Sequence, residues 1–105
     1  MFTNQIIVEY LGTGFVGWQI QKNGLSVQEV LEKVLSKLLK EKIRVIGSGR
    51  TDSGVHASEQ SAHFKTKQKI IDKNVFIHSV NFFLSKYSVS IFNIKKRPKK
   101  FHARH

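Results

Sequence analysis

A glycine-rich segment near the middle of the chain carries the side chains best suited to chemistry. Residues 47–57 read GSGRTDSGVHA, so the carboxylate of Asp52 follows the guanidinium of Arg50 by two positions among three glycines. Glycine permits close approach of the backbone to a ligand, and arginine offers a planar fork to phosphates or base edges. Asp-Ser-Gly is equally good turn chemistry, in which the aspartate bonds its own backbone. Composition alone does not decide whether Asp52 is a catalytic residue or a turn residue of a hairpin.

Signals for cofactors and metals are weak. Residues 12–17 spell the dinucleotide-binding GxGxxG, but the helix that should open at the last glycine begins only near Ser26. The segment around Asp52 lacks the lysine of a phosphate-binding P-loop. The chain has no cysteine, and none of its five histidines pairs with another four positions away. We therefore expect no cofactor and no bound metal.

Charge is concentrated in the second half of the 105-residue chain, whose formal net charge is +11. Residues 53–105 hold eleven Lys or Arg against two Asp or Glu, whereas residues 1–52 hold seven against five. Neutralising several phosphates gives strong, salt-sensitive binding, so this distribution favours a nucleic-acid partner over a merely solvated tail. The densest basic cluster comprises Lys95, Lys96, Arg97, Lys99, Lys100 and Arg104.

Hydrophobic residues make up 40% of the chain and charged residues 24%, which is typical of one globular domain. No apolar stretch approaches the roughly 18 residues of a membrane span, and the N-terminus lacks a signal pattern. We expect a soluble, cytoplasmic protein without a membrane partner.

The apolar patterning predicts two helices and four strands. A capping box at Ser26–Glu29 precedes an apolar stripe that runs through Leu39, and Asp72 caps a second helix containing Phe76, Val80, Phe83 and Leu84. Strands are predicted at residues 5–11, 43–46, 60–65 and 87–94. The resulting βαββαβ order predicts an α+β, ferredoxin-like domain, with an antiparallel sheet and two helices on one face.

Five motifs occur in a fixed order along the chain. Residues 49–57 read GRTDSGVHA, and Phe15–Gln19 with Gln21 read FVGWQ-x-Q. Ser26–Gln28 opens the predicted helix, Phe64 ends a Q-x-x-H-F strand, and residues 101–104 read FHAR. These motifs resemble those of the TruA family of tRNA pseudouridine synthases, and the match at residues 49–57 covers nine consecutive positions. Departures occur at Leu11, where the family usually has an acidic residue, and at Asn81–Ser85, where the family's proline is lost.

The resemblance implies isomerisation of uridine to pseudouridine in the anticodon stem-loop of tRNA, at the thirty-eighth to fortieth nucleotides, without cofactor or metal. Asp52 would then be the nucleophile, attacking either the base or the ribose, and Arg50 would occupy or stabilise the space that the base vacates. Further contacts to RNA would come from Thr51, His56, Gln19, Gln21, His102, Arg104, Lys95 and Lys96.

Members of this family continue into a second, related domain. Residues 1–105 are therefore expected to form an N-terminal catalytic-type domain without its C-terminal counterpart. We expect impaired activity, together with homodimerisation or other self-association through an exposed sheet edge. The alternative is an RNA-binding module of the RRM type without catalysis. An RRM needs stacking aromatics on its third strand, where this chain has only Phe64.

Overall fold

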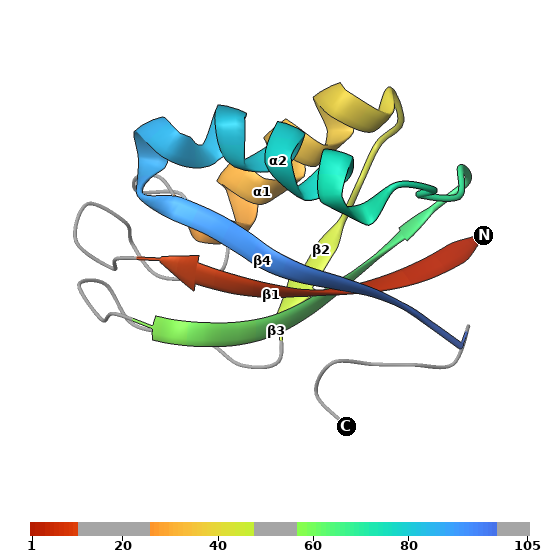
Figure 1. The fold of residues 1–105 in the computed structure, drawn as a ribbon, viewed down its shortest axis with the longest axis horizontal. Helices are drawn as coiled ribbons and strands as arrows, with labels where there is room; N and C mark the ends of the chain where they lie inside the picture. Colours follow the sequence, from red (N-terminus) through yellow and green to blue (C-terminus); the bar gives the residue numbers. More distant parts are fainter. Residues whose placement is uncertain (11–25, 48–56, 99–105) are drawn as a thin grey trace.

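The computed structural model describes residues 1–10, 26–47 and 57–98, and its elements follow the predicted βαββαβ order (Figure 1). The four strands form one antiparallel sheet in the order β2-β3-β1-β4, with α1 and α2 on the same face (Figure 1). This is the predicted α+β arrangement. The elements are β1 (Phe2–Tyr10), α1 (Val27–Leu39), β2 (Val45–Gly47), β3 (Ala57–Thr66), α2 (Lys73–Leu84), the 3₁₀ turn η1 (Ser85–Tyr87) and β4 (Val89–Arg97).

Helix α1 begins where the capping box predicts. The Oγ of Ser26 accepts a hydrogen bond of 3.1 Å from the amide of Glu29, which satisfies one of the free N–H groups of the first turn. The apolar stripe faces the sheet, and Leu38 and Leu39 pack against the core at the end of the helix. The fully packed part of the stripe consists of Val27, Val30, Leu31, Val34 and Leu35.

Helix α2 is capped by Asp72, whose Oδ1 accepts a hydrogen bond of 3.1 Å from the amide of Val75. Val80 and Leu84 are buried as the helical spacing predicts. Phe83 remains 37% exposed, so the apolar face predicted for this helix is only partly core.

Strand β4 differs most from its prediction. Tyr87 lies in η1 rather than in the strand, because the following Ser88 takes a left-handed φ of 58° that turns the chain before β4 starts. The strand then continues beyond residue 94, since its pairing with β1 extends to Thr3 opposite Arg97. The beginning of the basic cluster is therefore part of the sheet, where side chains alternate between faces.

Alternation along the strands divides the sheet into a core face and a helix-free face. The core face packs under both helices through Ile6, Val8, Tyr10, Ala62, Phe64, Ile91 and Ile94. Ala62 and Phe64 share this face, and His63 between them points the other way. His63 is only 3% exposed, although it lies on the helix-free face.

Side chains from the two helices satisfy backbone groups of both edge strands. The amide group of Asn81 donates a bond of 2.7 Å to the carbonyl of Ile91 and accepts one of 2.7 Å from its N–H. At the opposite edge, Val45 is held in the same way by two residues of α1, as described below. Asn81 is the first residue of the segment 81–85, in which the family's proline is lost, and its two hydrogen bonds tie α2 to β4. Within the described ranges, neither helix has the length and apolarity needed to cross a bilayer.

Candidate functional site

Two of the segments that contain predicted site residues are attached to the same end of the sheet. Tyr10, the last residue of β1, pairs with Ala57, the first residue of β3. Residues 11–25 therefore leave the sheet where residues 48–56 return to it. Both segments lie outside the described residues, and with them the side chains of Asp52, Arg50, Thr51, His56, Gln19 and Gln21.

A β-bulge marks the strand that receives the segment containing Asp52. Val8 pairs with Gln60 and Tyr10 with Ala57, so two residues of β3 lie opposite one residue of β1. Bulges increase local twist and are frequent beside active sites, where they redirect the chain. The irregularity therefore coincides with the end of the sheet to which residues 48–56 are attached.

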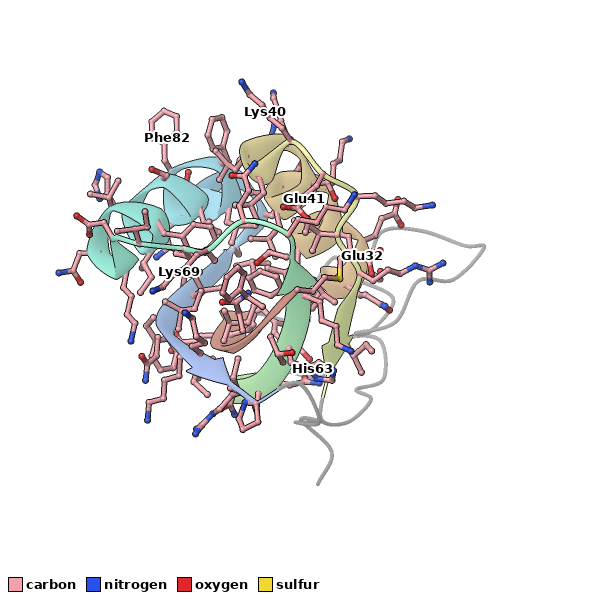
Figure 2. The ribbon with its side chains drawn as sticks, turned by 90° about the vertical axis from the view of Figure 1, so that its right-hand side faces the viewer. Glu32, Lys40, Glu41, His63, Lys69 and Phe82 are labelled. Atoms are coloured by element: carbon pink, nitrogen blue, oxygen red, sulfur yellow. The ribbon has the colours of Figure 1, made fainter. Side chains whose placement is uncertain are left out.

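Strand β2, which leads into that segment, is clamped by α1 at Val45. The N–H of Val45 donates to Oε2 of Glu32 over 2.9 Å, and its carbonyl accepts from Nε2 of Gln28 over 2.9 Å. The Gln28 amide also donates to Glu32 over 3.3 Å, so the two side chains orient one another. Glu32 lies between α1 and β2 (Figure 2). The clamp fixes the chain two residues before β2 ends at Gly47.

The helix-free face carries a connected row of polar side chains across three strands. The Nε of Arg97 donates a bond of 2.7 Å to Oε1 of Gln5, whose Nε2 donates one of 2.7 Å to Oγ of Ser61. The guanidinium is thereby oriented over the sheet rather than left to move freely. A small depression of about 110 Å³ lies beside it, lined by Gln5, Ile7, Asn93, Lys95 and Arg97. Two cations at such a depression suit a phosphate.

The two lysines predicted as RNA contacts, Lys95 and Lys96, lie on opposite faces of the sheet. Lys95 lies on the helix-free face and lines the depression beside Arg97. Lys96 points to the helix-bearing side, where its Nζ lies 4.7 Å from the centroid of the Phe2 ring. Adjacent residues of a strand face opposite ways, so Lys95 and Lys96 would contact an RNA from different sides of the sheet. Arg97 lies on the same face as Lys95, because residues two positions apart in a strand share a face and β4 extends to Arg97.

Two further predicted contacts, His102 and Arg104, lie outside the described residues. The segment that contains them follows Arg97, which pairs with Thr3 at the start of β1. The segment containing Asp52 joins β3 next to Tyr10, at the other end of β1. The two segments are therefore attached to opposite ends of the sheet. Among residues 1–10, 26–47 and 57–98, no group of three metal-ligating side chains occurs.

A family model described as tRNA pseudouridine synthase matches residues 6–105 of the chain, which is nearly its whole length. The chain belongs to this family. Within it, three curated relatives are tRNA pseudouridine synthases A, which agrees with the TruA resemblance of the motifs.

The relative from Pelagibacter ubique is 54% identical over 105 residues, which cover the entire chain and 43% of that protein. The relative from Ruminiclostridium cellulolyticum is 48% identical over 101 residues, covering 96% of the chain and 40% of the relative. The relative from Neorickettsia sennetsu is 47% identical over 98 residues, which cover 93% of the chain and 40% of the relative. The chain thus spans about two fifths of the length of these relatives.

Proposed function

We propose that this chain contributes the nucleophile of a TruA-type enzyme that converts uridine to pseudouridine in the anticodon stem-loop of tRNA. The target would be a uridine among the thirty-eighth to fortieth nucleotides. The observation that carries the proposal is the family match over residues 6–105, which includes the nine-residue motif around Asp52. The attachment of that motif to the bulged end of the sheet supports the assignment.

In the proposed reaction, the bond between the ribose and uracil N1 breaks, the uracil rotates, and a bond forms between the same ribose carbon and C5. The hydrogen on C5 leaves as a proton, and N1 gains one, so no redox partner is needed. The Asp52 carboxylate would form a transient covalent bond, either to the base or to the anomeric carbon. It must be ionised to do so, a state that a neighbouring cation such as Arg50 would favour.

The target base has to leave its stack to reach Asp52, which costs a few kcal/mol and less in a loop-proximal stem. Arg50 is proposed to occupy the vacated space. Lys95 and Arg97 would hold phosphates on the helix-free face, an interpretation supported by the depression that they line. The remaining proposed contacts to RNA are Thr51, His56, Gln19, Gln21, His102 and Arg104.

A catalysis-free module of the RRM type is less well supported. Such modules stack bases on aromatic rings of the two central strands. Here Phe64 of β3 points into the core and is 1% exposed, and Tyr10 of β1 is likewise buried. On the helix-free face of the described β1 and β3, the positions analogous to a stacking platform carry Gln5, Ile7, Ser61 and His63.

Alone, the 105-residue chain is expected to bind tRNA but to turn over poorly, because it corresponds to about two fifths of its relatives. Release of tritium from tRNA labelled at uridine C5 measures the reaction directly. A rate for the isolated chain equal to that of the complete Pelagibacter ubique relative would contradict this expectation.

The role of Asp52 is best tested in a chimera. The chain replaces the 105 aligned residues of the 54% identical relative, which yields a protein of complete length. We expect this chimera to release tritium and its Asp52→Ala variant to bind tRNA without releasing any. Surviving release in Asp52→Ala would remove the aspartate from its role, and Asp72→Ala provides a matched control because that carboxylate caps α2.

We also propose that the chain self-associates through a sheet edge and is located in the cytoplasm. The strand order leaves β2 and β4 as the edges of the described sheet, so these are the strands to which a second copy would add.

A further inference from the structure

Three lysines converge on the helix-bearing side of the sheet, away from the depression beside Arg97. Lys69 lies between β3 and α2, Lys73 is the first residue of α2, and Lys96 comes from β4. They belong to parts of the chain that only the fold brings together. Figure 2 shows Lys69 next to α2. The cavity at which they meet has a volume of about 300 Å³ and is lined by Asn4, Lys69, Ile70, Ile71, Lys73, Ile94 and Lys96.

The ammonium group of Lys96 is the centre of this cluster. Desolvation lowers its pKa most, and the positive charges of Lys69 and Lys73 lower it further. The ring of Phe2, 4.7 Å from Nζ to centroid, holds the side chain in place. The nearest acidic residue in sequence, Asp72, uses Oδ1 to cap α2. Like charges are thus gathered around a cavity without a carboxylate among its lining residues.

We propose that Lys69, Lys73 and Lys96 form a binding site for a phosphate group of RNA on the helix-bearing side of the sheet. An anion at the cavity would replace mutual repulsion of three cations by attraction to each of them. Lysine ammonium groups bind phosphate as point charges and do not need the planar geometry of arginine. The site extends the RNA-binding role proposed above and therefore rests on it.

The position of the site indicates the path of the RNA. Lys95 and Arg97 of β4 lie on the helix-free face, whereas Lys96 lies on the helix-bearing side. Because β4 is an edge strand, a polynucleotide that crosses this edge can contact both groups. The three residues Lys95–Arg97 thus present positive charge to both sides of one edge.

The test compares two triple variants of the chain. The site variant carries Lys69→Gln, Lys73→Gln and Lys96→Gln. The control variant carries Lys33→Gln, Lys40→Gln and Lys86→Gln, three exposed lysines outside this cavity. Lys40 stands at the end of α1, apart from Lys69 (Figure 2). Both variants lose the same formal charge, so any general attraction of the basic chain to RNA falls equally.

Binding of tRNA is measured by fluorescence anisotropy over a range of sodium chloride concentrations. The site variant should bind more weakly than the control, and its slope of log K against log salt should shrink by about 0.7–0.9 for each phosphate that the variant no longer neutralises. Equal affinities and slopes for the two variants would overturn the site. Circular dichroism checks that both variants fold.

Two further experiments are needed. One distinguishes RNA from a small anion as the ligand, and the other distinguishes failure of this site from failure of the proposed function. Titration with inorganic pyrophosphate, followed by NMR of the lysine εCH₂ groups, should shift Lys69, Lys73 and Lys96, and tRNA should displace it. Pyrophosphate binding without displacement by tRNA identifies a small-anion site and refutes RNA as the ligand. If Lys95→Gln with Arg97→Gln weakens tRNA binding while the site variant does not, the proposed function survives and this inference fails. If the unmodified chain binds no tRNA, both fail.

Discussion

Removing the carboxylate of Glu32 should destabilise the fold by about 2–3 kcal/mol. Glu32→Ala deprives the N–H of Val45 of its 2.9 Å acceptor, and Val45 is fully buried. A buried donor without a partner costs about 1–3 kcal/mol. The Gln28 amide also loses its bond to Glu32, which adds a smaller amount because Gln28 still reaches the carbonyl of Val45. Glu32→Gln keeps a neutral acceptor and should cost only about 1 kcal/mol, since charged hydrogen bonds are the stronger ones.

Urea unfolding followed by circular dichroism gives these free energies, and amide hydrogen exchange locates the effect. The order of stability should be wild type, then Glu32→Gln, then Glu32→Ala, with faster exchange at Val45 in the alanine variant. Lys33→Ala, at an exposed neighbouring position of α1, serves as the control and should change stability by less than about 0.5 kcal/mol. If Glu32→Ala is as stable as Lys33→Ala, or if protection at Val45 is unchanged, the clamp does not hold β2 in the manner described.

Three other outcomes are expected. Asn81→Ala should lower the free energy of unfolding by about 2–4 kcal/mol, because both backbone groups of buried Ile91 lose their 2.7 Å partners, whereas exposed Asn74→Ala on the same helix should have little effect. Lys96 should titrate below its ordinary pKa of 10.5 in an NMR titration. The unfolded chain then binds more protons than the folded one, so the contribution of this group to the free energy of unfolding should rise with pH between the lowered pKa and 10.5. Lys96→Gln should abolish this trend. Light scattering over a wide concentration range should detect self-association, and a strictly monomeric mass would count against pairing through a sheet edge.

Much of the fold follows from local signals in the sequence. The cap at Ser26 and the stripe behind it fix α1, because capping and apolar spacing act within one helix. The order of the elements then leaves few arrangements for a sheet with two helices on one face. The end of β4 was not predictable in this way. Lys95–Arg97 belong to a basic cluster beyond the strand predicted at residues 87–94, and only pairing with distant Thr3 makes them part of a strand.

The candidate site likewise contains residues that a local motif predicts and residues that only contacts between distant elements bring together. The motif around Asp52 is local and was found directly, whereas the row from Arg97 through Gln5 to Ser61 joins three strands and has no signature along the chain. Lys69 and Lys73 likewise carry no motif, and meet Lys96 only through the packing of α2 on β4. Contacts between elements depend on register, which a single sequence specifies weakly when neither face of an edge strand is continuously apolar.

The edge of β4 unites the RNA-binding and self-association proposals, because both make use of the same strand. On this strand, the side chain of Asn81 hydrogen-bonds the N–H and the carbonyl of Ile91. A bulge at Phe92 interrupts the pairing with β1, and Lys95 and Lys96 follow. Caps, bulges and lysines are the devices by which edge strands resist pairing with another chain. A second copy adding to β4 would have to displace the Asn81 bonds or bring two rows of lysines together. A polyanion meets neither obstacle, since it needs the lysines and leaves the Asn81 bonds intact, so the structure of this edge favours RNA over a second copy as its occupant.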